Sequence, residues 1–184
     1  KLMAKNAVVK AEHVIYRSAK DGREYRLDEM KPYGPDMRRL RGAEIGMVFQ
    51  DPMSSLNPVY KVGDQVAEGL IQHTGMKKAE ARAHVLDMFK KLGIPDPIRR
   101  MNDYPHQFSG GMKQRVVIAI AMICNPDVII ADEPTTALDV TIQAQIMELM
   151  KSLQINDHKS IILITHNMGL VAEMADEVCV MYMG

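Results

Sequence analysis

The stretch Tyr104–Val140, YPHQFSGGMKQRVVIAIAMICNPDVIIADEPTTALDV, decides the fold of this 184-residue chain. It holds two elements suited to phosphate chemistry, and the first begins at Ser109, the position of a helix N-cap. Gly110 and Gly111 follow and leave the backbone N–H groups unobstructed. A helix that begins there directs free N–H groups and the positive end of its dipole toward an anion. The sequence therefore predicts a phosphate site at the start of this helix.

The second element is the apolar run Val128–Ala131, which is followed directly by Asp132 and Glu133. A short run of apolar residues without alternation is typical of a strand buried on both faces, as in a parallel sheet. Ligands of α/β proteins bind beyond the carboxyl ends of such strands. The sequence thus predicts an α/β fold with two carboxylates at its ligand-binding edge.

Together these residues resemble a known family. SGGMKQR followed by IIADEPTTALD is similar to the signature motif, Walker B strand and D-loop of the ATP-binding subunits of ABC transporters. VFQDPMSSLNP, after a short strand, resembles the Q-loop of peptide-importing members. YPHQFSGGMKQR and PTTALDVTIQAQI favour the dipeptide and oligopeptide importers, although nickel importers share much of this wording. Residues 38–184 carry the resemblance well and residues 1–37 carry it poorly.

The resemblance implies a P-loop NTPase-like parallel sheet with a helical subdomain inserted between Q-loop and signature. We expect one partial ATPase domain over 1–184, divided into three parts. These are a partial core with a hairpin and the Q-loop at 1–61, a helical subdomain with the signature helix at 62–125, and a core with Walker B, D-loop and H-loop at 126–184. The pattern G-x-x-x-x-G-K-[ST] does not occur. We therefore expect a chain truncated at both ends, without its Walker A loop, rather than a degenerate protein.

Local patterns predict the remaining elements. The first half should contain a hairpin over 12–27 turning at Asp21-Gly22, a loop and short basic helix over 28–41, a strand over 45–49, an irregular surface loop over 51–58 and helices over 62–75 and 77–92. In the last helix we expect one apolar face, consisting of Ala79, Ala83, Leu86 and Phe89, with Gly93 just beyond the C-terminus.

The second half should contain a helix capped by Asp139 or Thr141, with an apolar stripe of Ile142, Ile146, Leu149 and Leu153. Buried strands should follow over 160–165 and 178–183. Gln50, the Asp132–Glu133 pair and His166 each end a predicted strand. If these strands are parallel, the side chains meet at one edge of the sheet.

The resemblance implies a role for each of these side chains. Asp132 would hold Mg²⁺, directly or through water, with Gln50 as a further metal or water contact. Glu133 would be the general base for the attacking water, and His166 would contact the γ-phosphate and orient that water. Taken singly, an Asp-Glu pair after a strand is more often a helix cap and a histidine more often structural. Their joint order favours the site.

The same resemblance implies further contacts with ATP. Ser109, Gly110 and Gly111 would bind the γ-phosphate of an ATP held by a second subunit, packed head to tail. Gln114 would belong to this nucleotide site, and Asp139 to a D-loop that communicates across the dimer. The implied ligands are therefore ATP and Mg²⁺, and the implied partners are a second ATP-binding subunit and a membrane permease.

Composition limits the classes of function. The formal net charge is zero, so no basic footprint for nucleic acid is present. No apolar run has the length of a membrane span. Cys124 and Cys179 lie in apolar stretches and are expected to be buried free thiols. The resemblance itself implies an importer ATPase for peptides at the cytoplasmic face of a bacterial inner membrane. The alternatives are an importer of nickel or another small solute, a soluble ABC ATPase acting on DNA or ribosomes, and an inactive fragment.

Overall fold

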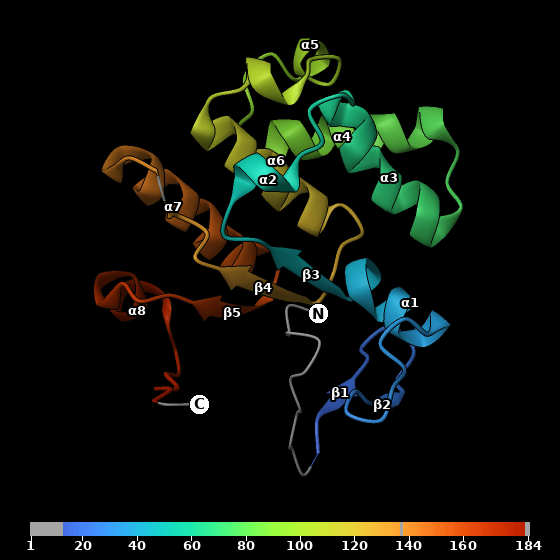
Figure 1. Cartoon of the computed structure of the whole chain (residues 1–184), viewed down its shortest axis with the longest axis vertical. Helices are drawn as coiled ribbons and strands as arrows, with labels where there is room; N and C mark the ends of the chain where they lie inside the picture. Colours follow the sequence, from blue (N-terminus) through green and yellow to red (C-terminus); the bar gives the residue numbers. More distant parts are fainter. Residues whose placement is uncertain (1–12, 137, 183–184) are drawn as a thin grey trace.

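A computed structural model of the chain describes residues 13–136 and 138–182. Its centre is a three-stranded parallel sheet of β3 (Ile45–Val48), β4 (Val128–Asp132) and β5 (Ser160–Ile164), in the order β3-β4-β5. Val48 pairs with Ala131, and Ala131 pairs with Leu163, so all three strands end at nearly the same level. The predicted parallel α/β sheet is confirmed (Figure 1).

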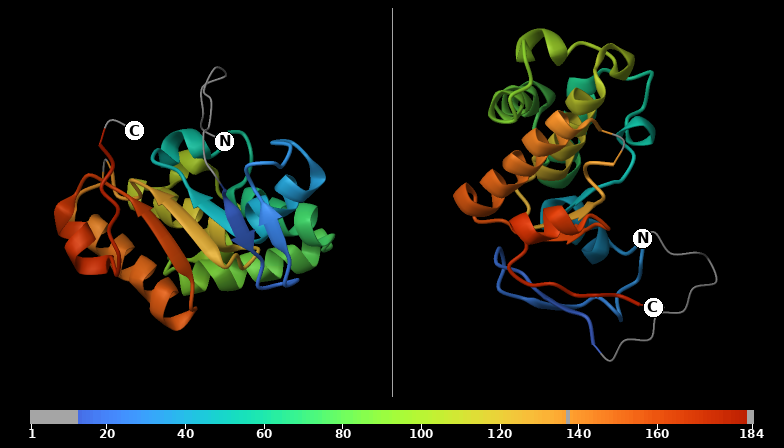
Figure 2. Two further views of the ribbon diagram at one scale, coloured as in Figure 1. Left: turned by 90° about the horizontal axis from the view of Figure 1, so that it is seen from below. Right: turned by 90° about the vertical axis from the view of Figure 1, so that its left-hand side faces the viewer.

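Helices cover one face of this sheet more than the other. They are α1 (Pro35–Ala43), α2 (Pro52–Ser55), α3 (Val62–Thr74), α4 (Lys78–Lys91), α5 (Pro97–Arg100), α6 (Gly110–Met122), α7 (Val140–Asn156) and α8 (Met168–Met174), with a short 3₁₀ turn at Pro105–Gln107. Helices α6 and α7 lie on one face of the sheet, and α3 to α5 form a lobe beyond α6 (Figure 1). Seen from below, the strands have no helix in front of them (Figure 2). Among the described residues, none of these helices is both long and apolar enough to cross a bilayer.

This one-sided cover explains the burial of the strands. Ile129 and Ala131 of β4 are fully buried beneath the helices. On β5, Ile162 and Ile164 remain 53% and 48% exposed, because the side chains of a strand alternate between the two faces. The expectation of a buried strand over 160–165 is therefore wrong for the outer face of β5.

The predicted N-terminal hairpin is present as β1 (Ile15–Arg17) and β2 (Glu24–Arg26), which pair antiparallel. Gly22 adopts a φ of 69° in the connecting loop, a conformation that glycine tolerates best. From the same loop, the Lys20 ammonium donates to the backbone carbonyls of Ala43 and Cys124. The first carbonyl belongs to the last residue of α1, and the second lies two residues beyond the end of α6. Lys20 thus joins the hairpin to the C-terminal ends of both helices.

Capping residues set the ends of three helices as the sequence indicates. The Ser109 hydroxyl accepts from the backbone N–H of Met112, 3.3 Å away, at the start of α6. At the start of α7, the cap is Asp139 and not Thr141, because the carboxylate of Asp139 accepts from the N–H of Ile142 at 2.9 Å. Helix α4 ends with Gly93 at a φ of 64°.

The lobe and the sheet share one continuous hydrophobic core, in which α6 contacts α3, α4, α7 and β3. Arg115 of α6 reinforces this junction with two hydrogen bonds. Its guanidinium donates to the backbone carbonyl of Leu92 at the end of α4 and to Oε1 of Gln145 on α7. One side chain therefore joins three helices.

Further expectations differ from the structure. Residues 51–58 include the short helix α2, which begins at Pro52, a residue with a φ suited to a first helical turn. In α4, the fully buried face is Ala81, Val85 and Phe89, whereas Ala79 and Ala83 are exposed. Alanine is small enough to occur on either face, so it does not fix the phase of an amphipathic helix.

The C-terminal prediction of a strand over 178–183 is also wrong, because residues 178–182 form no strand and residue 183 lies outside the described chain. Cys179 in this segment is exposed, while Cys124 is half-buried and burial raises the pKa of its thiol. The expectation of two buried thiols therefore fails at Cys179. Both cysteines are free.

Candidate functional site

Three side chains from the ends of three neighbouring strands meet at the carboxyl edge of the sheet. The carboxylate of Glu133, just beyond β4, is the centre of this group. Nε2 of Gln50, which follows β3, donates to Oε2 of Glu133 at 3.1 Å. Nδ1 of His166, which follows β5, lies 2.7 Å from Oε1 of Glu133. The expected gathering of these three side chains at one edge is confirmed, while their chemical roles remain predictions.

The backbone at Glu133 has an unusual conformation. Its φ is 44°, in the left-handed region that non-glycine residues rarely adopt. The N–H of Glu133 donates to the carbonyl of Ile164 at 2.9 Å, which fastens the end of β4 to the end of β5. Strained backbone of this kind concentrates at functional sites, where the surrounding structure holds it.

A tight turn follows, and it supplies a fourth member of the group that the sequence did not reveal. The N–H of Thr136 donates to the carbonyl of Glu133 at 3.1 Å, and Pro134 occupies the second position of this turn, where its fixed φ is favourable. The hydroxyl of Thr136 then donates to Oε2 of Glu133 at 2.7 Å. The spacing Glu-Pro-x-Thr carries the signal for this contact, since a turn brings its first and fourth residues together.

These contacts determine the protonation of the carboxylate. The hydrogen bond from Thr136, followed by those from His166 and Gln50, lowers the pKa of Glu133 below its ordinary value. An ionised carboxylate only accepts hydrogen bonds, so Nδ1 of His166 carries the donated proton. Nε2 of His166 then stays outside this bond and remains for a substrate contact.

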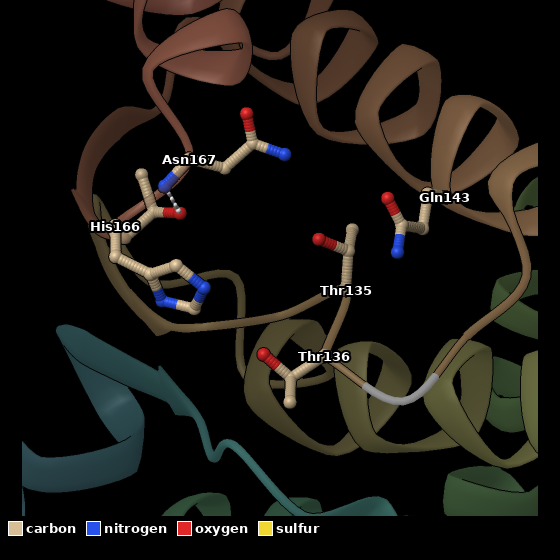
Figure 3. A pocket seen from close by; sticks show the side chains of 6 residues that line it. Thr135, Thr136, Gln143, His166 and Asn167 are labelled. Atoms are coloured by element: carbon tan, nitrogen blue, oxygen red, sulfur yellow. Dashed lines mark hydrogen bonds between the residues drawn. The ribbon is translucent and has the colours of Figure 1, made fainter.

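A shallow hollow of about 210 Å³ lies beside this group (Figure 3). Its lining consists of polar side chains from Thr135, Thr136, Gln143, Thr165, His166 and Asn167. The hydroxyl of Thr165 accepts from the N–H of Asn167 at 3.1 Å, and the side chain of Asn167 caps α8. Small-molecule pockets usually measure roughly 300–1,000 Å³, so the hollow suits a phosphate group and water rather than a whole nucleotide.

Asp132 and Gln50 provide the oxygen atoms that a magnesium ion prefers. Asp132 is the last residue of β4 and is half-buried, and Gln50 comes two residues after the neighbouring strand β3. Because Nε2 of Gln50 donates to Glu133, its amide oxygen remains for a cation. Among the described residues no group of three His, Cys, Asp or Glu side chains forms a complete metal cage, so Mg²⁺ would bring substrate or water ligands here.

The N-terminus of α6 presents a separate surface. Ser109 and Gly110 are exposed there, as an anion-binding helix end requires. Gly111 is instead buried, and a Cβ at this position would lie 2.7 Å from Cγ2 of Ile142 on α7. Gln114 is only 1% exposed. In the described part of the chain, no hydrogen bond reaches its Nε2. Its side chain therefore does not lie on the surface that Ser109 and Gly110 form.

Comparison with known proteins agrees with this geometry. A family model described as ABC transporter matches residues 10–136, more than half of the chain. The chain is 61% identical over 149 residues to the dipeptide transport ATP-binding protein DppD of Bacillus subtilis, a match that covers 81% of this chain and 44% of the relative. It is 58% identical over 149 residues to the oligopeptide transport ATP-binding protein OppD of the same species, covering 81% and 42%. The chain thus spans less than half the length of these curated relatives.

A solved structure gives the same result for the fold. A dimeric ATP-binding cassette in a post-hydrolysis state, bound to ADP and Pi, superposes with a TM-score of 0.68 at 32% identity. The match covers 79% of this chain and 61% of that chain. The expected fold class, an ATPase cassette with a parallel sheet and helices, is confirmed.

Proposed function

This chain belongs to the ABC transporter family, and on that premise we propose that it forms part of the ATP-hydrolysing subunit of a peptide importer. Identities of 61% and 58% to dipeptide and oligopeptide transport ATP-binding proteins support the peptide as cargo. The single observation that supports hydrolysis most strongly is the convergence of Gln50, Thr136 and His166 on the Glu133 carboxylate.

In the proposed reaction, Glu133 takes a proton from a water molecule held at the sheet edge. The water oxygen forms a bond to the γ-phosphorus of ATP, and the bond from that phosphorus to the β–γ bridging oxygen breaks with its electron pair leaving on ADP. The lowered pKa of Glu133 keeps the carboxylate ionised at neutral pH. His166 is fixed by its bond to Glu133 and directs Nε2 toward the γ-phosphate.

Asp132 and the amide oxygen of Gln50 are the residues that would hold Mg²⁺. The ion, when bound, neutralises charge on the phosphate oxygens. Asp132 is the last residue of β4 and directly precedes Glu133, so it lies at the same edge of the sheet.

The remaining expected residues belong to a contact between two subunits. Ser109 and Gly110 are exposed at the start of a helix of thirteen residues, which suits the γ-phosphate of a nucleotide carried by a second copy. Asp139, the exposed cap of α7, would lie in the same contact. Gly111 is buried beneath this surface, where it packs closely against Ile142 of α7. We place the assembled subunit on a membrane permease, at the cytoplasmic face of the membrane, with a helical subdomain over 62–125 between two parts of the core.

The test is Glu133→Gln in the intact protein, a change that keeps the shape of the side chain and removes the base. We expect ATP binding to persist while turnover falls by about 10²–10⁴-fold, as for loss of a general base, and ATP-dependent dipeptide uptake to fall with it. The matched control is Glu148→Gln, on the exposed side of α7. Turnover near the wild-type rate in Glu133→Gln would refute the assignment of the base. Uptake of Ni²⁺ instead of dipeptide would refute the cargo.

A further inference from the structure

We propose that Thr136 is a positioning residue for hydrolysis: its hydroxyl engages Oε2 of Glu133, so that Oε1 is the atom that takes the proton from the attacking water. This inference rests on the proposed function, since it assigns a role within the same site. The motif that suggested the site did not single out Thr136, and its contact with Glu133 follows only from the geometry of the turn.

The first argument counts the acceptor sites of the carboxylate. A carboxylate offers about four lone-pair sites, two on each oxygen. Oε2 of Glu133 accepts from Gln50 at 3.1 Å and from Thr136 at 2.7 Å, so both of its sites are used. Oε1 accepts from Nδ1 of His166 at 2.7 Å, and one site on this oxygen remains for water. The oxygen of Glu133 that can still accept a proton is therefore Oε1, which lies on the same side of the carboxylate as His166.

The second argument compares how the partners of Oε2 are anchored. Gln50 is 83 residues away in the sequence and comes from another strand, and its amide is also expected to meet the metal. Thr136 is three residues away and belongs to the same turn as Glu133. A second hydrogen bond, from the N–H of Thr136 to the carbonyl of Glu133, closes that turn at 3.1 Å. Thr136 is thus the partner of Oε2 that the local chain holds in place, whereas Gln50 reaches the same oxygen from another strand.

The third argument concerns rigidity. Glu133 has a left-handed φ of 44°, and Pro134 fixes the next φ, so the backbone between Glu133 and Thr136 has little freedom. The hydroxyl of Thr136 then restricts the side chain as well. A preorganised group loses less entropy at the moment of reaction than one that must be ordered.

The experiment measures ATP turnover and KM in the intact protein for Thr136→Val, which keeps the branched shape and removes the hydroxyl, and for Thr136→Ser, which keeps the hydroxyl. Loss of a hydrogen bond to a charged group predicts a fall in kcat of about 10- to 100-fold for Thr136→Val, with KM for ATP nearly unchanged. Thr136→Ser should recover kcat to within about threefold of wild type. Thr74→Val is the matched control, since the hydroxyl of Thr74 donates to the carbonyl of Leu70 at 2.6 Å in the lobe.

A double variant separates positioning from a general structural role. If Thr136 acts through Glu133, Thr136→Val should not lower the residual turnover of Glu133→Gln any further. Normal kcat in Thr136→Val, equal loss in the valine and serine variants, or additive loss in the double variant would each overturn the inference. Full turnover in Glu133→Gln alone would instead overturn the proposed function, so the two failures are distinguishable.

Discussion

Replacing Gly111 by alanine should destabilise the protein, although the same replacement one residue earlier should not. A Cβ at Gly111 would lie 2.7 Å from Cγ2 of Ile142 and 3.4 Å from its Cδ1. A Cβ at Gly110 would meet only Cδ2 of Leu138, at 3.6 Å, an ordinary contact. The two glycines are neighbours at the start of α6, so the pair isolates the effect of packing against α7.

The magnitude follows from this geometry. Carbon atoms pack best at about 3.5–4.0 Å, so α6 and Ile142 must separate by roughly 1 Å to admit the new methyl group. Overpacking of this kind costs about 1–3 kcal/mol. Both alanines gain helix propensity, by at most about 1 kcal/mol. Gly111→Ala should therefore be about 1–3 kcal/mol less stable than Gly110→Ala.

Urea unfolding followed by circular dichroism measures this difference, and melting temperatures should differ by about 2–4 °C for each kcal/mol. Ile142→Ala removes the clashing methyl, so the double variant Gly111→Ala with Ile142→Ala should show a favourable coupling of about 0.5–3 kcal/mol. Equal stabilities for the two glycine variants, or no coupling with Ile142, would refute the contact between α6 and α7.

Two further predictions concern the core and the pH dependence. Phe89→Ala should lower the free energy of unfolding by about 3–5 kcal/mol, because Phe89 is fully buried. Ala83→Ser, on the exposed side of α4, should change it by at most about 0.5 kcal/mol. Similar urea midpoints for both variants would contradict the burial of Phe89 in α4. The hydrogen bond from Thr136, with those from His166 and Gln50, holds the pKa of Glu133 below its ordinary value. The stability that Glu133 contributes should therefore be fully present above the pKa of the unfolded state, and it should be lost as the pH falls through the lower pKa of the folded state. Unfolding of wild type and Glu133→Gln at a series of pH values tests this, and a difference between them that grows on acidification would be the contrary result.

The sequence predicted the parts of the site that depend on topology. Gln50, Glu133 and His166 each follow a strand, and parallel strands place their carboxyl ends together, so their meeting could be inferred without coordinates. The caps at Ser109 and Asp139 were predictable for a similar reason, because a cap depends on local residue chemistry.

Other features depend on tertiary packing that a single sequence does not encode locally. The spacing Glu-Pro-x-Thr indicates the turn that brings Thr136 to Glu133, but no residue pattern indicates the left-handed backbone at that glutamate. Gly111 is predicted to bind phosphate together with Gly110, and its close approach to Ile142 of α7 is a packing role that the sequence does not show. The pattern predicts Ala79, Ala83, Leu86 and Phe89 as the apolar face of α4, whereas Ala81, Val85 and Phe89 are buried, because alanine occurs on both sides of this helix.

The two hydrogen bonds of Arg115 have a mechanical consequence. The guanidinium is planar and its donors point in fixed directions, so its contacts with the carbonyl of Leu92 and with Gln145 hold the end of α4 and the flank of α7 at a set angle across α6. A torque on the lobe that turns α4 must either drag α7 along or break one of these bonds. Because α7 begins at Val140, seven residues after Glu133, Arg115 would transmit such a movement of the lobe to the segment that carries the carboxylate.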